Sequence, residues 1–384
     1  MSLKTVRGNS RVVHVIEYLH RGAVENWLVR MFRHAKRSGL QLDWTFYCTL
    51  GMAGDLDSEV AALGGRIIYS PVPIGRKLAF IRALRGELRR GGYDVLHCHH
   101  DLVSAIYLTA SFGLPIRLRL VHVHNADESV LTPRRWKQRL LLEPLRLTCL
   151  TLSDRIVGIS QHTLDTFLNG RARRLGRDVV HYYGVDATRF QAVRGDREGF
   201  RRDWNLPVDS LLLLFAGRMV PEKNPVFAVE VLAELNRLNP RVYGVFVGSG
   251  SLEIPAKERA EQLGVKEAVL FLGWSNAIPE IMSACDWYIL PHPEQPMEGF
   301  GLAVVEAQLA GLRLILSTGI ADDPLLPDAC VARLSLTAGP TAWARSAIDL
   351  LARARPSHAQ VIISLARSPF DMDIALRDLL ALYQ

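Results

Sequence analysis

Two glutamates in the segment PMEGFGLAVVEAQLAG have the type and spacing expected of a site for an extended polar ligand. Glu298 precedes the glycines Gly299 and Gly301, and Glu306 lies eight positions after Glu298. The glycines favour a loop at Glu298 and a helix that starts near Gly301 and contains Glu306. The carboxylates would then address opposite ends of one ligand, and the start of the helix would attract an anion. Spacing alone, however, favours two ordinary solvated glutamates.

Three further residues that could bind phosphate follow an apolar run in LLLLFAGRMVPEKN: Gly217, Arg218 and Lys223. The carboxyl ends of parallel strands line the ligand crevice of an open α/β sheet, so a cation pair there is well placed to hold phosphates. Two solvated surface cations fit equally well. The later segment VFVGSGSLE carries glutamate where a dinucleotide fingerprint needs its third glycine. Gly248 and Gly250 therefore predict a tight turn near a ligand, and hydride transfer loses its main support.

Histidines gather at the ends of two expected strands: His97, His99, His100, His122 and His124. The period of two places His97 with His99, and His122 with His124, on one face of their strands. Asn125 follows directly, and Asp101 and Asp127 are the nearby carboxylates that a metal would want. These imidazoles could bind a metal, but we expect hydrogen bonding in a crevice instead. Four other histidines are predicted to be ordinary, satisfied polar residues: His14, His20, His34 and His358.

Two other segments each allow two interpretations. In HRGAVENWLV, Gly22 could bring the backbone close to a phosphate or sugar, or could simply mark the start of a helix. In LTPRRWKQRLLLEPLRL, five basic residues surround Trp136 and the leucines 140–142. This pattern suits a peripheral membrane surface or a solvated helix packed on its own domain. No nucleic-acid motif accompanies the basic residues, which are Arg134, Arg135, Lys137, Arg139 and Arg146.

Length and composition limit the classes of protein in which these residues can lie. The chain has 384 residues, of which 49% are hydrophobic and 22% charged, and this predicts two globular domains. Its five cysteines are scattered without a C-x-x-C pair, which indicates a reducing cytosol and no structural zinc. We expect neither a signal peptide nor a membrane-spanning helix. Residues 1–190 hold 28 Lys and Arg against 16 Asp and Glu, so the first half should meet an anionic partner.

Strand and helix patterns alternate along both halves, which predicts two parallel sheets covered by helices on both faces. A charged, poorly periodic stretch at 194–205 separates the halves. Helices are expected at 25–38, 225–238, 303–310 and 370–383. Strands are expected at 11–18, 42–50, 65–69, 93–98, 118–123 and 155–159, and at 210–216, 243–247, 268–272, 287–290 and 313–316.

Taken together, these segments resemble the family 4 glycosyltransferases, a retaining group with two facing Rossmann-like domains (the GT-B architecture). The resemblance covers nearly the whole chain. It extends from RGAVENWLVRMFR through the histidine segments and VHYYGVDATRF to FAGRMVPEKNP, VFVGSGSLE and EGFGLAVVEAQLAG, in the family's order. Its most specific part is the pair Glu298 and Glu306 combined with Arg218 and Lys223. The subgroup that looks most similar acts in bacterial exopolysaccharide assembly.

The resemblance implies a role for each of these residues. Arg218 and Lys223, after Gly217, would neutralise the donor diphosphate, and Glu306 would hold the ribose hydroxyls. Glu298 would hold the hydroxyls of the transferred sugar, and the 299–301 turn, through Phe300 and Gly301, would offer backbone N–H groups.

On the first-domain side, His124, or His122 as the competing assignment, would bond the sugar near the reacting carbon, with His99 and Asn125 beside it. Gly22 would approach the phosphates. Two departures from the family pattern are Ala23, where a second glycine is common, and Tyr183, where asparagine is usual.

The resemblance also implies an activity and an organisation. The expected protein is a metal-independent hexosyltransferase that uses a UDP- or GDP-linked sugar, needs no cofactor, and extends a lipid-linked or polysaccharide acceptor. It would be cytoplasmic, with or without peripheral contact at the inner face of the membrane, and would not bind nucleic acid. The expected domains are 1–190 for the acceptor, 191–368 for the donor, and 369–384 as a helix crossing back to the first. Two alternatives remain, a non-catalytic nucleotide-sugar-binding module and a basic surface binder of membrane or nucleic acid.

Overall fold

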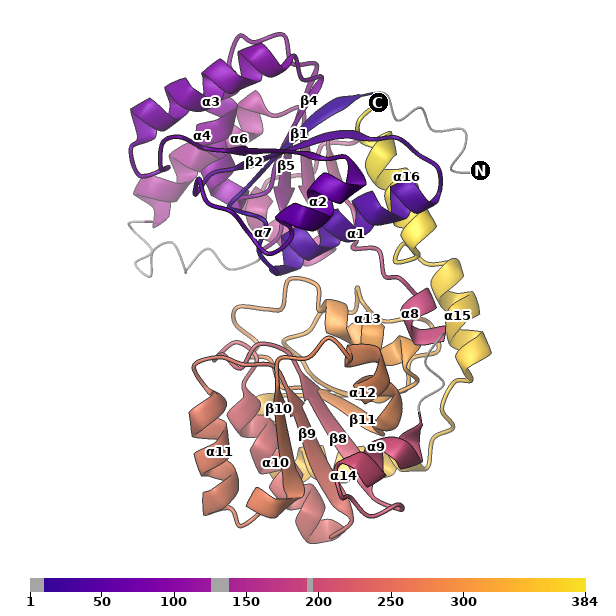
Figure 1. Cartoon of the computed structure of the whole chain (residues 1–384). Coiled ribbons are helices and arrows are strands. Elements are labelled where there is room, and N and C mark those ends of the chain that lie inside the picture. Colours follow the sequence, from indigo (N-terminus) through magenta and orange to yellow (C-terminus); the bar gives the residue numbers. More distant parts are fainter. Residues whose placement is uncertain (1–9, 126–137, 192–195) are drawn as a thin grey trace. The chain divides into compact units, whose positions relative to one another are not determined.

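The computed structural model describes residues 10–125, 138–191 and 196–384, and the chain forms two compact units. The first unit comprises the chain up to Gly184 together with Met372–Gln384, and the second comprises Val185–Asp371. The boundaries expected from the sequence fall after residues 190 and 368. Within the first unit, the C-terminal helix packs beside the helix that follows the first strand (Figure 1).

The first unit is built on a parallel sheet of seven strands in the order β3-β2-β1-β4-β5-β6-β7. Strands and helices alternate along the chain, as the sequence predicts. Its elements are β1 (Arg11–Ile16), α1 (Ala23–Arg37), β2 (Asp43–Cys48), α2 (Asp57–Leu63), β3 (Arg66–Tyr69), α3 (Lys77–Gly91), β4 (Val95–Cys98), η2 (Asp101–Val103), α4 (Ser104–Ser111), β5 (Leu118–Val123), η3 (Gln138–Leu142), α6 (Glu143–Leu152), β6 (Arg155–Gly158), α7 (Gln161–Leu168), β7 (Asp178–Val180) and α16 (Met372–Ala381).

The two faces of this sheet differ in chemistry. Toward α3, α4 and α6 the strands present an apolar core that includes Val13, Leu96 and Val121. Toward α1 and α16 the same strands present aromatic rings and histidines. The parallel register pairs His14 of β1 with His97 of β4, so these two rings share a face.

The second unit is a six-stranded parallel sheet in the order β10-β9-β8-β11-β12-β13. Its central strand β8 is continuously apolar because helices cover both of its faces. Its elements are α8 (Thr188–Gln191), α9 (Arg197–Asp203), β8 (Leu211–Ala216), α10 (Pro225–Leu238), β9 (Val242–Val247), α11 (Glu253–Gln262), η4 (Lys266–Ala268), β10 (Val269–Gly273), α12 (Ile278–Ala284), β11 (Trp287–Leu290), α13 (Leu302–Leu309), β12 (Arg313–Ser317), β13 (Val331–Leu334), η5 (Leu336–Ala338), α14 (Gly339–Leu351) and α15 (His358–Ala366).

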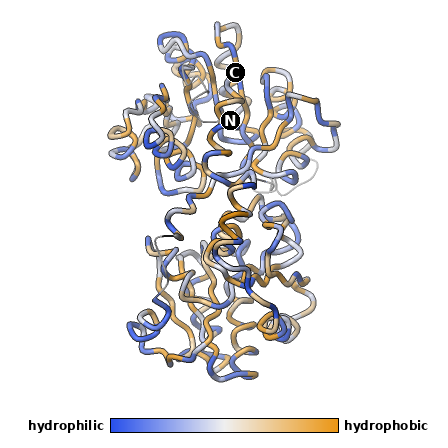
Figure 2. The backbone as a smooth tube through the Cα atoms, turned by 90° about the vertical axis from the view of Figure 1, so that its right-hand side faces the viewer, coloured by the Kyte–Doolittle hydropathy of each residue, from blue (hydrophilic) through white to orange (hydrophobic). Residues whose placement is uncertain are grey.

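The predicted fold class is confirmed, since both sheets are parallel and carry helices on both faces. Hydrophobic and hydrophilic stretches alternate along the backbone of each unit, as expected where buried strands alternate with loops that reach solvent (Figure 2). The poorly periodic stretch at 194–205 contains the helix α9. A side-chain cap compensates for its weak periodicity: the Asp196 carboxylate accepts a hydrogen bond from the backbone N–H of Gly199.

Candidate active site

In the second unit, two loops that follow adjacent strands pack backbone against backbone. The loop after β8 carries Gly217 and Arg218, and the loop after β9 carries Gly248 and Gly250. A Cβ on Gly248 would lie 2.0 Å from the carbonyl oxygen of Gly217, and one on Gly250 would lie 2.4 Å from that of Met219. The two glycines thus permit a close approach that fixes the backbone next to the exposed Arg218.

Glu298 lies at the centre of a small charged cluster near the end of β11. Its Oε2 forms an ion pair with Lys223 Nζ and lies 3.5 Å from His292 Nε2. The side chains of Lys223 and Glu298 are only 19% and 15% exposed. The turn itself is anchored by a hydrogen bond from the backbone N–H of Glu298 to the carbonyl of Gly319.

The charge of this cluster follows from competing effects on Glu298. Burial alone would raise the pKa of the Glu298 carboxyl, but Lys223, His292 and Arg218 outweigh it and lower that pKa. Burial lowers the pKa of His292, although Glu298 opposes that shift. At neutral pH the cluster therefore holds an anionic Glu298 against a cationic Lys223, beside a neutral imidazole.

The helix α13 begins directly after the cluster, as expected from its glycines. Gly301 is its N-cap with a φ of +79°, in the left-handed region that glycine adopts without strain. Phe300 is buried against Phe370, with ring centroids 5.4 Å apart. Glu306 lies within α13, and both it and Glu298 contribute to the raised pKa of the buried Tyr288, after burial itself.

In the first unit, Gly22 precedes α1 but side chains of the unit itself fill the space beside it. A Cβ at Gly22 would lie 2.4 Å from Glu25 Oε2 and 2.5 Å from His20 Nε2. Glu25 is 5% exposed, and burial raises the pKa of its carboxyl. The expected approach of Gly22 to a phosphate stays a prediction.

The end of β5 is fixed by Asp101, a residue with a φ of +43°. Its carboxylate accepts hydrogen bonds from the backbone N–H of His124 at 2.7 Å and from Asn125 Nδ2 at 2.8 Å. The sequence considered Asp101 only as a metal ligand. Its observed position instead holds two of the expected sugar-side residues in place.

The expected histidines lie together on one face of the sheet. His99 bonds both His14 and His124, while His122 bonds His97. Both ring nitrogens of His124 are engaged, because its Nδ1 lies 2.7 Å from Tyr183 Oη. Ring nitrogens of His14, His97 and His99, and of His99, His122 and His124, lie within 4.8 Å of one another, so two metal-binding triads are geometrically feasible.

The sequence missed several members of this network. His14 was expected to be a solitary satisfied residue, but its Nδ1 bonds His99 and its Nε2 has no partner among residues 10–125, 138–191 and 196–384. Tyr183 and Tyr383 also join the network. His14 joins the network through the pairing of β1 with β4, which the sequence does not show. Tyr183 was noted only as a departure from the family pattern, and nothing in the local sequence marked Tyr383.

The basic segment around Trp136 is only partly described. Residues 126–137, which include Asp127, Arg134, Arg135, Trp136 and Lys137, lie outside the described residues. Leu140 and Leu141 are exposed. Arg146, however, is buried and donates to Glu143 Oε1 at 2.8 Å and to the carbonyl of Phe167. Of the two interpretations given for this segment, Arg146 therefore fits the helix packed on its own domain, since its side chain joins α6 to α7.

Comparisons with known proteins identify the class that this fold and site define. The structure resembles that of Anabaena Alr3699/HepE in complex with UDP and glucose, with a TM-score of 0.76 at 17% identity over 97% of this chain and 98% of that one. It also resembles WaaG, a glycosyltransferase involved in lipopolysaccharide biosynthesis, with a TM-score of 0.65 at 16% identity over 96% and 94% of the two chains. The fold is the GT-B architecture of glycosyltransferases.

Family models assign each half of the chain. Residues 24–189 match the model described as Glycosyltransferase Family 4, and residues 196–320 match Glycosyl transferases group 1. Both halves of the chain are therefore identified as parts of a glycosyltransferase.

Among curated relatives, EpsF of Bacillus subtilis (strain 168), a glycosyltransferase by name, is 29% identical over 97% of this chain and 96% of its own. A UDP-Gal:alpha-D-GlcNAc-diphosphoundecaprenol alpha-1,3-galactosyltransferase of Escherichia coli is 26% identical over 68% and 67% of the two chains.

Concerning membranes, no helix within the described residues is both long and apolar enough to cross a bilayer. The five cysteines are buried and free.

Proposed function

We propose that this glycosyltransferase moves a sugar from a UDP- or GDP-linked donor to a lipid-linked or polysaccharide acceptor, with retention of configuration and without a metal ion. The observation that carries the proposal is the cluster of Lys223, Glu298 and His292, with Arg218 close enough to act on the same carboxylate. This cluster stands beside the N-terminus of α13. Two cations and a helix N-terminus in one small region form a ready site for a diphosphate.

In the proposed complex, Arg218 and Lys223 contact the diphosphate, and backbone N–H groups of Phe300 and Gly301 contribute further donors. The ammonium group of Lys223 then contacts both the Glu298 carboxylate and the phosphates. Glu298, held ionised by its basic neighbours, accepts hydrogen bonds from hydroxyls of the transferred sugar. Glu306, within α13, accepts them from the ribose.

The chemistry breaks the bond between the anomeric carbon and the diphosphate oxygen, which leaves an oxocarbenium-like sugar and a more negative diphosphate. Fixed cations and the helix dipole stabilise that charge as it develops, and they do not need to reorganise. The acceptor hydroxyl attacks from the face that the diphosphate leaves, and its proton passes to a phosphate oxygen. Arg218, Lys223 and the N-terminus of α13 stabilise the charge on the departing diphosphate, so the proposal assigns no step to a metal.

For the acceptor, the named substrate of the Escherichia coli relative and the name of WaaG support a glycan built on a lipid carrier. The proposed place is the cytoplasmic face of the membrane, in exopolysaccharide or cell-surface glycan synthesis. Two features of the first unit suit contact with anionic lipid headgroups. These are the excess of basic residues in 1–190 and the exposed apolar side chains of Leu78, Leu140 and Leu141.

The test combines donor binding with analysis of the product. Calorimetry with UDP-galactose, UDP-glucose and GDP-mannose should identify one donor that binds, with undiminished affinity in EDTA. Incubation of that donor with GlcNAc linked to diphosphoundecaprenol, followed by mass spectrometry and NMR, should give a product one hexose heavier with the anomeric configuration of the donor. Binding without transfer to any lipid-linked or polysaccharide acceptor would instead support a non-catalytic module.

A further inference from the structure

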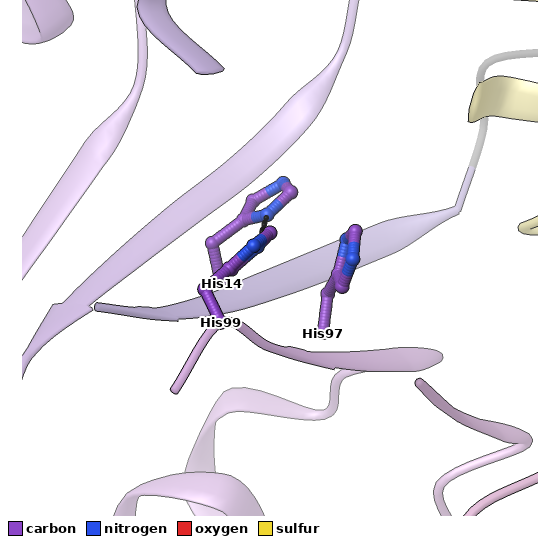
Figure 3. A group of neighbouring side chains, drawn as sticks. All are labelled: His14, His97 and His99. Carbon is purple, nitrogen blue, oxygen red and sulfur yellow. Dashed lines mark hydrogen bonds between the residues drawn. The ribbon is translucent and has the colours of Figure 1, made fainter. Parts of the chain in front are cut away.

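The first unit contains a directional row of hydrogen-bonded side chains, which we call the His14 row: His14, His99, His124 and Tyr183. His14 Nδ1 lies 3.0 Å from His99 Nε2, and Figure 3 shows the hydrogen bond between these two rings. His99 Nδ1 lies 3.0 Å from His124 Nε2, and His124 Nδ1 lies 2.7 Å from Tyr183 Oη. Each imidazole therefore uses Nδ1 toward the next member of the row, and His99 and His124 use Nε2 toward the one before.

This geometry couples the protonation of the three rings. Burial lowers the pKa of His14 and of His124 to about 3 and also lowers that of His99, so all three imidazoles are neutral near pH 7. A neutral imidazole has one N–H and one lone pair. Two facing nitrogens must be one donor and one acceptor, so the row permits only two arrangements: every ring protonated at Nδ1, or every ring protonated at Nε2.

The inner end of the row distinguishes these arrangements. His14 Nε2 is buried without a partner in the described chain, and the ring lies among Trp44 and Phe46, with centroids at 4.5 and 5.4 Å. Protonation at every Nε2 would leave a buried N–H without an acceptor, whereas protonation at every Nδ1 would leave only a lone pair there. Buried unpaired N–H groups are the rarer of the two in folded proteins.

We propose that the His14 row holds His124 as the Nδ1–H tautomer, donating to Tyr183, and that His14 and His99 act as positioning residues for the sugar-side edge of the first unit. The role in the reaction rests on the proposed function, but the tautomer does not. With Nε2 accepting from His99 and Nδ1–H donating to Tyr183, the His124 ring is fixed in rotation as well as in protonation.

A metal ion is the competing explanation for so many close imidazoles. Zinc ligands lie about 2.0–2.1 Å from the ion, so their nitrogens must converge on one point. In the His14 row each contacting nitrogen instead faces one partner, and His99 uses its two nitrogens toward different rings. Of the three rings drawn in Figure 3, only His14 and His99 share a hydrogen bond, although the ring centroids of His97 and His99 are 4.1 Å apart. A metal in either triad would have to break hydrogen bonds of His99.

The experiment compares two matched tyrosine substitutions in the full-length protein. Tyr183→Phe removes only the hydroxyl at the outer end of the His14 row. Tyr383→Phe removes the hydroxyl that lies 2.9 Å from His97 Nδ1, in the neighbouring row that continues to His122. The readout is the ¹⁵N NMR signals of the imidazoles in the donor-free protein, which distinguish protonated from bare ring nitrogens, together with elemental analysis for bound metal.

In the wild-type protein we expect His14, His99 and His124 to be Nδ1–H tautomers, without stoichiometric metal. Tyr183→Phe should turn all three into tautomer mixtures together, whereas Tyr383→Phe should leave them unchanged. A shift confined to His124 in Tyr183→Phe, Nε2–H tautomers in the wild-type protein, or one equivalent of zinc per chain would overturn the proposal.

Kinetics then test the link to the reaction. Once a donor is known, Tyr183→Phe should lower kcat about tenfold with little change in the KM for the donor, and Tyr383→Phe should stay within about twofold of the wild-type rate. If coupled tautomers are seen but kcat is unchanged, the positioning role is wrong. If no donor is ever bound, the proposed function fails, and the NMR result still decides the tautomer.

Discussion

At the scale of single residues, Asp101 has the greatest local influence on the sugar-side edge of the first unit. It adopts a left-handed backbone conformation, which is unfavourable for most residues other than glycine and asparagine. In that conformation its carboxylate holds the backbone of His124 and the side chain of Asn125. The strained backbone is retained because these hydrogen bonds compensate for it.

Asp101→Ala should destabilise the protein by about 1–3 kcal/mol, because two donors lose their acceptor and the left-handed conformation loses its support. Asp101→Asn should retain most of that stability, since asparagine tolerates this conformation and its carbonyl oxygen still accepts. Urea unfolding of the two variants measures the difference. Equal stability of Asp101→Ala and wild type would contradict this role.

Two members of the second-unit cluster, Lys223 and Glu298, were predicted from the sequence as binding residues. Lys223 and Glu298, some 75 positions apart, form an ion pair. His292 was not predicted, because a histidine in a loop has no periodic signal and its contact with Glu298 arises only from the fold. The two interpretations of Arg146 could not be separated from the sequence, because a basic context does not reveal burial, which depends on the packing of α6 against α7.

At the scale of elements, the loops after β8 and β9 control where Arg218 lies. Gly248 has a φ of +123°, and its missing side chain admits the carbonyl of Gly217. Strand β9 pairs with β8 along its whole length, so any shift of its loop is transmitted to the residues after β8. The glycines of this segment therefore position a phosphate-binding side chain.

Gly248→Ala should weaken nucleotide-sugar binding at least tenfold, because its Cβ would displace the backbone next to Arg218. The matched control is Gly264→Ala, which also has a positive φ, +70°, but whose Cβ would meet no atom within 4 Å. That control should cost about 1 kcal/mol of stability and leave donor affinity unchanged. Calorimetric titration compares the two, and equal affinity in both variants would refute this role of the β9 loop.

Most strands could be predicted from the sequence because the central strands are continuous apolar runs. The two strands that were missed, β7 (Asp178–Val180) and β13 (Val331–Leu334), are edge strands. β7 has three residues, and β13 is only half-buried with an arginine inside it. Such strands form because a neighbouring strand supplies hydrogen-bond partners. The local sequence does not show which strand will lie beside them.

At the scale of the whole molecule, the two units should respond differently to acid. The histidines of the first unit are neutral because burial lowers their pKa, to about 3 for both His14 and His124. The unfolded chain protonates them near pH 6.5. Below pH 6.5 the unfolded state therefore binds more protons than the folded state, and stability falls as the pH falls toward 3.

By pH 5, each of these two histidines should have removed about 2 kcal/mol of stability from the first unit. Hydrogen exchange measured by mass spectrometry at pH 7 and pH 5, corrected for the intrinsic exchange rate, should show β4 and β5 losing protection while β8 and β9 keep theirs. Uniform loss of protection in both sheets would contradict this expectation. Replacement of His14 by phenylalanine should reduce the acid sensitivity of β4 and β5.

The central claim is that Arg218 and Lys223 stabilise the departing diphosphate more than they stabilise the bound donor. The most direct measurement is kcat at saturating donor, with donor affinity measured in parallel, for Arg218→Ala and Lys223→Ala. The control is Lys266→Ala, whose exposed ammonium pairs with Glu261. The account predicts that each of the first two lowers kcat about 10²-fold, with a smaller loss of affinity, and that the control has no effect. A wild-type kcat in Lys223→Ala at saturating donor would contradict it.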